Sequence, residues 1–166
     1  QKKQYIEEDN MNTVIKEIID KKEKEIISKE VLYDLPEWFG LPESTKEYIE
    51  DSQDKPFLAC YADNEVAGFI VLNATSKDTA DIFLMGIKKK FHRMGIGTKL
   101  NTEFENIAKN LGYSYSQVKT VKMGHYKEYD ITNEFYIAMG YKELECFPTL
   151  WDEWNPCQIY IKYLGE

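Results

Sequence analysis

The segment DIFLMGIKKKFHRMGIGTKLNTEFENIAKNL, residues 81–111, contains the pattern from which the fold is predicted. It begins with an apolar run over 82–87, continues through a basic segment over 88–93 and reaches Gly95-Ile96-Gly97, where a helix is expected to begin. A strand that leads into a glycine turn at a helix N-terminus presents unpaired amides, and such amides bind phosphate. The helix is predicted because apolar residues recur at helical spacing, at Ile96, Leu100, Phe104, Ile107, Ala108 and Leu111.

The glycine spacing narrows the kind of phosphate loop that is expected. A dinucleotide-binding loop needs a third glycine where this chain has Leu100, and a nucleoside-triphosphate loop needs Gly-Lys-Ser/Thr where it has Gly97-Thr98-Lys99. Residues 92–97, HRMGIG, instead resemble the acetyl-CoA pyrophosphate loop of the GNAT superfamily of N-acetyltransferases, Arg/Gln-x-x-Gly-x-Gly/Ala. One position differs, because His92 stands where that loop has Arg or Gln. An ordinary strand–turn–helix connection is the alternative interpretation.

The chain on both sides of this loop fits the same superfamily. Residues 56–61 and 66–72 are predicted to form an antiparallel hairpin, and FYIAMGY at 135–141 resembles the family's Phe-Tyr-x-x-x-Gly-Phe/Tyr helix end. The resemblance implies an α/β GNAT fold, with a mixed, mostly antiparallel sheet of about six or seven strands, flanking helices and a splayed cofactor cleft. Further strands are expected over 13–19, 113–121, 141–147 and 157–164, with helices that begin after Asp20 and at Pro42.

Composition indicates one domain. With 166 residues and 43% hydrophobic content the chain can bury one core but is short for two domains. The GNAT domain is therefore expected over 11–166, and the polar residues 1–10 are expected to be a disordered extension or a leftover of the expression vector. No apolar run approaches the length of a membrane span, about 20 residues.

The three cysteines and the net charge narrow the setting and the partners. Cys60, Cys146 and Cys157 have no metal-type spacing and an odd count, so we expect no metal site, a reduced cytoplasmic location and cysteines that act as small hydrophobic residues. The net charge of −8 disfavours nucleic acid as a partner, because its phosphates would be repelled. The basic cluster at 88–93 is expected to keep the approach to the loop cationic, with a solvated connector as the alternative.

The resemblance also implies which residues hold acetyl-CoA, the expected co-substrate. Amides near Gly86 would stabilise the oxyanion formed on carbonyl attack, and the strand there would pair with the pantetheine arm. Gly86 is expected either to permit a bulge that splays this strand from its neighbour or to relieve packing. The family often has Asn seven residues before the helix-end tyrosine, where this chain has Tyr129, with Asn133 closer. The expected cofactor-binding residues are Met85, Ile87, His92, Arg93, Met94, Gly95, Ile96, Gly97, Thr98 and Asn133.

Transfer of an acetyl group to an amine needs a base and an acid. An alkyl ammonium with a pKa near about 10.4 must lose a proton before attack, so a carboxylate, histidine or water chain has to receive it. Asp81 aligns with the glutamate that is the general base in histone acetyltransferases of the superfamily, DIFLMGI against EIVFCAV, and is expected to act through a water. The alternatives are a polar strand-start role for Asp81 and His125 as base. Tyr136 falls on the tyrosine that protonates the leaving thiolate in the family, with a core aromatic role as the alternative.

The acceptor amine is the least constrained part of the reaction. Trp38 and Phe39 lie in the segment that walls the acceptor site in GNAT folds, with core packing as the alternative. A loop is expected over 147–156, and two tryptophans and two acids in it are a composition that holds a cation by charge and ring faces. The expected substrate-binding residues are Trp151, Asp152, Glu153 and Trp154.

The expected reaction is direct transfer of an acetyl group from acetyl-CoA to a primary amine, with no covalent enzyme intermediate. The late strands resemble aminoglycoside 6'-N-acetyltransferases, so a polyamine-like antibiotic is the sharpest expectation. A generic small-molecule amine, a peptide N-terminus and a protein lysine stay open. An acyl-CoA-binding module without catalysis is a hypothesis of a different class. Homodimers are frequent in the superfamily, but nothing in the residues decides the oligomeric state.

Overall fold

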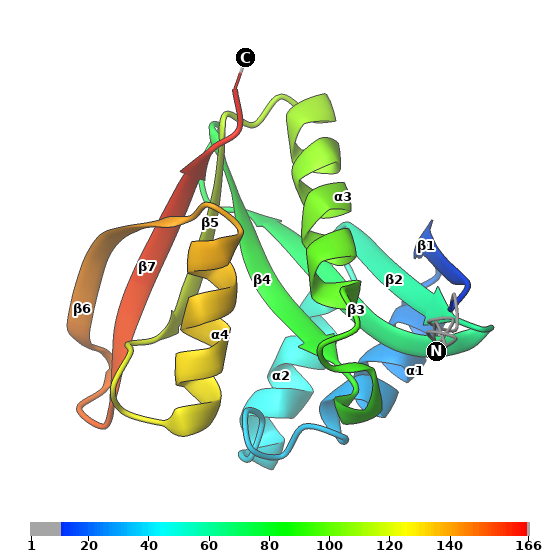
Figure 1. Ribbon diagram of the computed structural model, residues 1–166, viewed down its shortest axis with the longest axis horizontal. Helices are drawn as coiled ribbons and strands as arrows, with labels where there is room; N and C mark the ends of the chain where they lie inside the picture. The colour runs from blue at the N-terminus through cyan, green and yellow to red at the C-terminus, as the bar shows by residue number, and fades with distance from the viewer. Residues whose placement is uncertain (1–10, 166) are drawn as a thin grey trace, which may run out of the picture.

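A seven-stranded sheet forms the centre of the computed structural model, which describes residues 11–165 (Figure 1). The strand order is β1-β2-β3-β4-β5-β7-β6, and all neighbours are antiparallel except the parallel pair β4 and β5. The predicted mixed, mostly antiparallel sheet is confirmed, whereas the extension expected over residues 1–10 lies outside the described residues. The strands are β1 (Thr13–Glu17), β2 (Phe57–Ala62), β3 (Glu65–Ala74), β4 (Thr79–Ile87), β5 (Tyr115–Val121), β6 (Lys142–Asp152) and β7 (Asn155–Tyr163).

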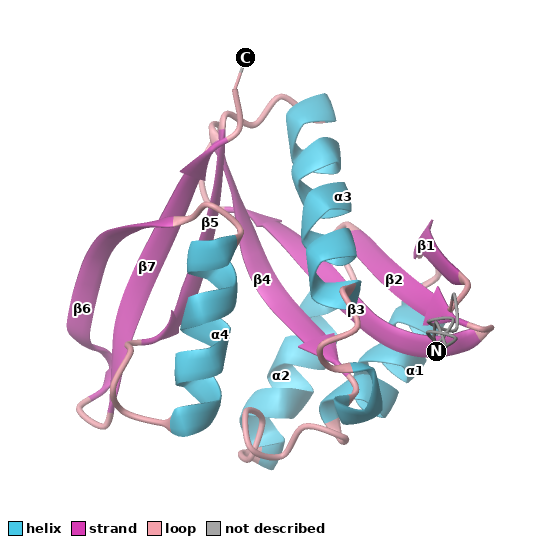
Figure 2. Ribbon diagram, in the orientation of Figure 1, coloured by secondary structure: helices cyan, strands magenta, loops and turns pink. Residues whose placement is uncertain are grey.

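The described residues form four α-helices, which cover the two faces of the sheet (Figure 2). Helices α1 and α2 pack on one face over a core that contains Val31 and Phe57, and α3 and α4 pack on the other over a core that contains Leu100 and Ile70. None of these helices combines the length and the apolar character that crossing a membrane requires. The helices are α1 (Lys21–Leu32), α2 (Pro42–Ser52), α3 (Ile96–Asn110) and α4 (Lys127–Ala138), with a short 3₁₀ helix η1 (Lys89–Phe91) after β4.

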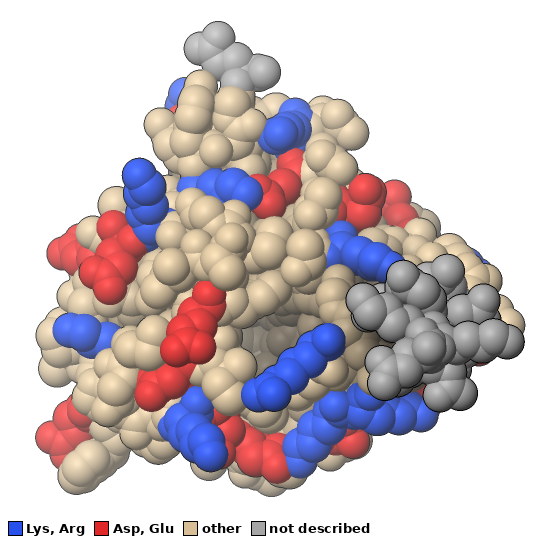
Figure 3. Space-filling view, viewed as in Figure 1, with Lys and Arg blue, Asp and Glu red and all other residues tan. Residues whose placement is uncertain are grey.

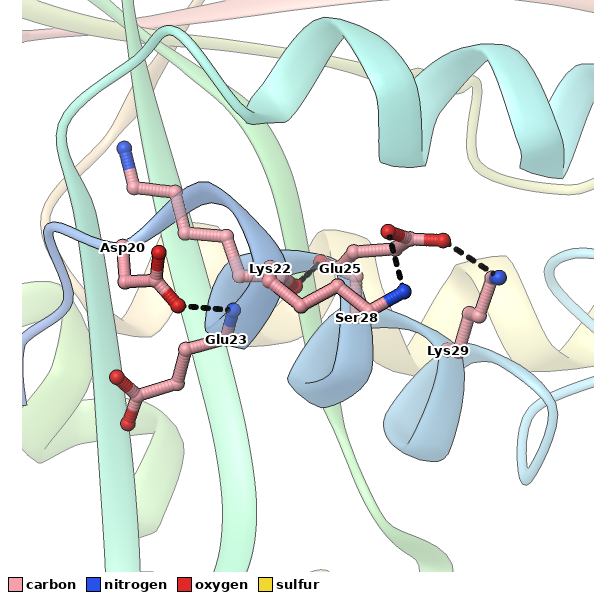
Figure 4. A network of polar contacts seen from close by, with 7 residues as sticks. Asp20, Lys22, Glu23, Glu25, Ser28 and Lys29 are labelled. Carbon is pink, nitrogen blue, oxygen red and sulfur yellow. Dashed lines mark hydrogen bonds and ion pairs between the residues drawn. The ribbon is translucent and has the colours of Figure 1, made fainter.

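Helix α1 begins where the sequence predicts, directly after Asp20. The Asp20 carboxylate accepts a hydrogen bond from the amide of Glu23 at 3.1 Å and so caps the first turn (Figure 4). Farther along the helix, Glu25 forms ion pairs with Lys22 at 3.3 Å and with Lys29 at 2.7 Å. The start of α1 is therefore fixed by local contacts, and the helix ends at the segment 33–41, which forms part of the site.

The β2–β3 hairpin is confirmed, and its turn chemistry explains it. Asp63 and Asn64 have φ values of 48° and 68°, the left-handed conformations of a two-residue hairpin turn that Asp and Asn tolerate. This turn makes β3 the antiparallel neighbour of β2, and β4 then pairs along the other side of β3. The hairpin thus places β4 in the middle of the sheet.

Strands β4 and β5 pair at one end only and then diverge (Figure 1). Residues 79–82 of β4 pair with residues 115–118 of β5, and the pairing stops there. The register between β3 and β4 shifts at the same level, so that Phe83 has no partner on β3. This irregularity marks the point from which the sheet opens, which confirms the predicted splay beside the cofactor strand.

The bulge expected at Gly86 is wrong. Gly86 pairs regularly with Phe69, and the register shift lies at Phe83 instead. A Cβ atom at Gly86 would lie 3.0 Å from a methyl group of Val31 and 3.3 Å from one of Leu35. The missing side chain therefore lets α1 and the residues after it pack closely on β4, so the packing interpretation of Gly86 holds.

The loop expected over 147–156 is mostly strand. β6 continues to Asp152 and β7 starts at Asn155, so only two residues remain for the turn. β6 is the edge strand of the sheet, and Pro148 lies between Phe147 and Asp152, where the regular pairing with β7 is interrupted, so its missing amide breaks no regular ladder. The aromatic and branched residues that follow Pro148 favour an extended backbone, and they continue the strand.

Candidate active site

A cleft of about 1050 Å³ opens where β4 and β5 diverge. Its walls come from the ends of β4 and β5, the start of α3, one side of α4 and the segment between α1 and α2. Figure 3 shows this face of the molecule hollowed near its middle, with a Lys or Arg side chain reaching over the hollow. The cleft therefore brings together residues that are far apart in the sequence.

The glycine turn presents a row of backbone amides at one end of the cleft. Helix α3 begins at Ile96, and the amide of Lys99 donates the hydrogen bond that starts the helix, to the carbonyl oxygen of Gly95 at 3.1 Å. Within residues 11–165, the amides of residues 93–98 have no acceptor. Arg93 and Gly95 have positive φ values of 62° and 79°, an alternation that turns successive amides toward one side. Such a row at a helix N-terminus is suited to bind an anionic phosphate.

Gly97 lies where this turn meets the cleft. A Cβ atom at Gly97 would lie 3.1 Å from Cδ1 of Ile87 and 3.2 Å from Cε2 of Phe135. Glycine therefore lets the end of β4 and the side of α4 close against the helix start. The lack of a side chain also leaves the amide of Gly97 open to a ligand.

His92 anchors the turn to its surroundings. Its Nε2 donates a hydrogen bond to the carbonyl oxygen of Ile87 at 2.6 Å, and its ring packs edge-on against Trp38 with the centroids 5.9 Å apart. These contacts join the end of β4, the turn and the α1–α2 segment. His92 thus fixes the loop, and Arg93, the next residue, also lines the cleft.

The cationic approach expected from the lysines at 88–90 is wrong. Lys88 is only 7% exposed, and its Nζ lies 3.0 Å from a carboxylate oxygen of Glu30 and 3.6 Å from one of Glu65. The other two lysines are also paired, Lys89 with Glu37 and Lys90 with Glu65. Because acidic residues neutralise all three lysines, Arg93 is the member of the basic cluster whose charge serves the cleft.

Tyr136 lies on α4 in the wall of the cleft, with 5% of its surface exposed. Its ring packs against Tyr141 and Tyr160, and its hydroxyl lies 3.9 Å from the sulfur atom of Met85. Burial raises the pKa of the phenol above its ordinary value, with smaller effects from Tyr141 and Asp81. The phenol therefore keeps its proton at neutral pH, as a general acid must before it acts.

Asp81 lies on β4 with 5% of its surface exposed, and it accepts a hydrogen bond from Nε2 of Gln117 at 3.2 Å. Burial raises the pKa of its carboxyl group, while the charge of Lys119 and the hydrogen bond from Gln117 lower it. Asp81 does not itself line the cleft, although the next two residues of β4 do. The role of Asp81 as a base that acts through a water stays a prediction.

Residues 24–127 match the family model described as the GNAT acetyltransferase family. The chain belongs to the GNAT family of acetyltransferases. The matched region runs from α1 to the start of α4 and so includes both the glycine turn and the diverging strands. The chain is therefore an acetyltransferase that uses acetyl-CoA.

Solved structures of GNAT proteins share this fold at low sequence identity. A GNAT-family protein from Desulfovibrio desulfuricans gives a TM-score of 0.79 at 14% identity, over 93% of this chain and 100% of that one. The aminoglycoside 6'-N-acetyltransferase from Enterococcus faecium gives 0.72 at 18% identity, over 92% and 98% of the two chains. A GNAT acetyltransferase from Elizabethkingia anophelis with acetyl-CoA bound gives 0.67 at 16% identity, over 92% and 98%. A search of curated proteins found no match.

Two residues expected to hold the GNAT co-substrate do not have side chains in the cleft. Asn133 is fully buried, and its Nδ2 donates to the carbonyl oxygens of Val121 at 2.8 Å and Tyr129 at 2.7 Å. Its Oδ1 accepts a hydrogen bond from the hydroxyl of Tyr160 at 2.6 Å, so the contact predicted for Asn133 is wrong. The side chain of Met94 is 52% exposed and lies outside the cleft lining, which leaves its backbone amide as its contribution.

The structure places half of the predicted acceptor residues at the GNAT cleft. Trp151 and Asp152 line it, whereas Glu153 and Trp154 form the β6–β7 turn and do not. The carboxylate of Asp152 accepts hydrogen bonds from the amides of Trp154 and Asn155, both at 2.9 Å. The charge of Asp152 therefore stabilises the turn, and His125, the alternative base, is exposed and lies outside the cleft lining.

Further aromatic residues line the GNAT cleft, and only some of them were expected from the sequence. Trp38 and Phe39 line the cleft and also pack against the core beneath α1 and α2. Tyr48 of α2 and Phe83 of β4 were missed, and their rings lie 5.5 Å apart. On α2, Tyr48 lies three residues after the buried Thr45 and four before the buried Ser52, the helical spacing of a residue that faces the sheet.

Proposed function

We propose that this GNAT protein transfers an acetyl group directly from acetyl-CoA to the primary amine of a small cationic molecule. The observation that carries this proposal is the row of unpaired amides at residues 93–98, which lies in the same cleft as the phenol of Tyr136. A phosphate-binding turn and a proton donor in one cleft are what transfer from a phosphorylated thioester donor requires.

The chemistry of the cleft fits acetyl-CoA. The amides of residues 93–98, the positive end of α3 and the guanidinium of Arg93 suit the diphosphate. The edge of β4 beyond Ile82 has no partner on β5, so its backbone groups can pair with an extended, amide-containing chain such as the pantetheine arm. When bound, acetyl-CoA supplies the activated acetyl thioester.

Asp81 and Tyr136 are assigned the two proton transfers. Asp81 receives the proton that the ammonium form of the acceptor must lose, through an intervening water, and the rise of its pKa by burial makes it a stronger base than an exposed aspartate. The amine nitrogen then forms a bond to the acetyl carbon as the bond from that carbon to sulfur breaks. Tyr136 gives its phenolic proton to the departing sulfur, and amides near Gly86 stabilise the negative charge on the carbonyl oxygen.

An aminoglycoside is one candidate among such cationic amines. The aminoglycoside 6'-N-acetyltransferase from Enterococcus faecium shares the fold at 18% identity, and Trp151 lines the acceptor end of the cleft as expected for a residue that contacts a cation. Release of free thiol from acetyl-CoA, measured across aminoglycosides, polyamines, simple amines and peptides, tests the proposal. Thiol release with any primary amine supports it, and binding of acetyl-CoA without transfer to any amine would favour the non-catalytic binding module.

The state of the cysteines supports the expected cytoplasmic location. All three are free, and Cys60 and Cys157 are buried on strands, where burial raises the pKa of both thiols. Buried thiols of raised pKa are unreactive, which suits a protein that functions without disulfides. We propose a reduced compartment on this basis.

A further inference from the structure

The acceptor end of the cleft is walled by aromatic rings from the α1–α2 segment, α2, β4 and the N-terminal end of α4. On one side, the ring of Tyr48 lies 6.5 Å from that of Phe39 and 5.5 Å from that of Phe83. On the side of α4, the rings of Tyr126 and Tyr129 lie 6.0 Å apart. The hydroxyl of Tyr129 donates a hydrogen bond to the carbonyl oxygen of residue 38 at 3.1 Å, which joins the two sides. We name these five rings the aromatic wall.

Few carboxylates are free to meet positive charges at this end. Among the described residues, Glu37 and Asp152 are the two acidic residues that line the cleft. Glu37 is paired with Lys89, and both oxygens of Asp152 accept hydrogen bonds from its own turn. Asp81 lies behind the lining, so it offers one further negative charge at this end.

Positive charges are already present beside the aromatic wall. Lys119 lines the cleft, and its charge lies close enough to Asp81 to affect the carboxylate. The Nζ atom of Lys55 lies 4.7 Å from the centre of the Phe83 ring. This contact shows that a ring of the wall accepts an ammonium group by its face. Lys55 itself lies outside the cleft lining, so a ligand with several ammonium groups would meet repulsion from Lys119.

We infer that the acceptor is a molecule with one ammonium group on an apolar, aromatic body, which the aromatic wall binds. The inference rests on the proposed acetyl transfer and narrows its substrate class. Ring faces bind both an apolar body and a single cation, whereas each additional ammonium would need a carboxylate that is not already paired with a lysine, hydrogen-bonded within its own turn or behind the lining. An arylalkylamine has this chemistry, and a polyamine or an aminoglycoside does not.

A comparison of four defined amines as acceptors tests the inference. Thiol release from acetyl-CoA is measured with 2-phenylethylamine, butylamine, spermidine and kanamycin. We expect kcat/KM for phenylethylamine to exceed that for each of the other three by at least tenfold. Equal or higher kcat/KM with spermidine or kanamycin would overturn the inference and leave the proposed acetyl transfer standing. No thiol release with any of these amines or with peptides would overturn both.

Substitutions in the aromatic wall test whether its rings cause the preference for phenylethylamine. Tyr48→Leu should lower kcat/KM for phenylethylamine about tenfold and that for butylamine less than threefold, whereas Tyr48→Phe should retain the preference. Tyr33→Leu is the matched control, because Tyr33 is 67% exposed at the end of α1 and lies outside the cleft lining. Acetyl-CoA binding measured by calorimetry shows whether each variant is folded, and Phe39→Leu replaces Tyr48→Leu if that variant is not. An unchanged preference in a folded wall variant would overturn the assignment.

Discussion

Arg93 adopts a backbone conformation that ordinarily favours glycine, with φ at 62°. The left-handed conformation costs a residue with a Cβ about 1–2 kcal/mol, and a glycine avoids this cost but loses about 0.5–1 kcal/mol through its more flexible unfolded chain. We therefore expect Arg93→Gly to raise the free energy of unfolding by about 0.5–1 kcal/mol relative to Arg93→Ala, measured by urea denaturation. The strain is retained, we infer, because the turn needs both this conformation and a guanidinium.

Arg93→Gly and Arg93→Ala also separate the effect of the backbone conformation on stability from the effect of the charge on binding. Both lose the guanidinium that lines the cleft, so both should bind acetyl-CoA about tenfold more weakly, which is about 1.4 kcal/mol. Calorimetry measures this loss. Equal stability of the two variants, or an unchanged affinity in either one, would contradict the role given to Arg93.

The hydroxyl of Tyr136 has a thioether as its neighbour, at 3.9 Å, and the ring carries the packing. Tyr136→Phe should therefore leave stability and acetyl-CoA affinity nearly unchanged while it lowers kcat about 10²-fold, the usual contribution of a general acid. Because burial raises the pKa of Tyr136, the native enzyme should not lose activity through ionisation of this phenol as the pH rises to about 10. An unchanged kcat in the variant would remove Tyr136 from the mechanism.

Asp81 couples activity to stability with a defined sign. Its pKa in the folded protein is raised above the ordinary 3.8, so the native state binds more protons than the unfolded state in the window just above that value. The free energy of unfolding should therefore fall as the pH rises through the window, and the neutral Asp81→Asn variant should lack this fall. Urea denaturation from pH 3 to 8 should show the variant to be more stable than the native protein at neutral pH.

Asp81→Asn should lower the activity although it raises the stability. A base is needed most where the acceptor amine is most fully protonated, so kcat/KM should fall most at the lower end of the neutral range and recover as the pH approaches the pKa of the amine, about 10. A uniform loss at every pH, without a gain in stability, would indicate that Asp81 is a packing residue.

At the scale of elements, the α1–α2 segment is tied to α4 across the cleft. Nε1 of Trp38 donates a hydrogen bond to Oγ1 of Thr132 at 3.3 Å, and Tyr129 donates to the carbonyl oxygen of Trp38. Thr132→Val keeps the volume but removes the acceptor, so it should raise KM for the amine about three- to tenfold, as expected for a hydrogen bond of about 1 kcal/mol. Thr132→Ser retains the hydroxyl and should have the KM of the native protein. A similar KM in the native protein and both variants would show that the hydrogen bond from Trp38 to Thr132 does not affect binding of the amine.

Elements whose cause is local were predictable from the sequence. The apolar period from Ile96 to Leu111 specifies α3, Asp20 caps α1 through a residue three positions away, and Asp63-Asn64 adopts its turn through its own backbone preferences. The glycine turn was predictable for the same reason, because the residues before and after Gly95 specify the strand and the helix that it joins. These elements and one end of the cleft therefore follow from short-range patterns, whereas the sheet architecture was expected from the resemblance to the GNAT superfamily.

Properties that depend on distant partners were not predictable in this way. The charge of Lys88 is neutralised by Glu30 and Glu65, which only the packing of α1 and the β3–β4 register bring to it. Asn133 is a polar helix residue in the sequence, and its role appears only when Val121 and Tyr160 surround it. The aromatic wall likewise assembles residues that lie up to 90 positions apart.

At the scale of the whole molecule, the sheet is held together at its centre by a short pairing. Residues 79–82 and 115–118 join the half that contains β1–β4 to the half that contains β5–β7, and beyond them the cleft separates the two. A ligand that lies between β4 and α4 contacts both halves, so it binds the folded state only. At a concentration of 100 times its Kd, acetyl-CoA should raise the free energy of unfolding by about 2.7 kcal/mol.

The binding of acetyl-CoA to the folded state predicts both how much the protein is stabilised and which amides are protected. For a chain of 166 residues the added stability should raise the Tm by about 5–10 °C, measured by scanning calorimetry. Hydrogen exchange should slow at the amides of residues 93–98 and in the half of α4 that faces them, because the ligand accepts hydrogen bonds from the first and excludes water from the second. Gly97→Val should abolish both effects, since its side chain would occupy the space between Ile87 and Phe135. A higher Tm without slower exchange at 93–98 would mean that acetyl-CoA binds elsewhere, and the reaction assigned to this cleft would then be wrong.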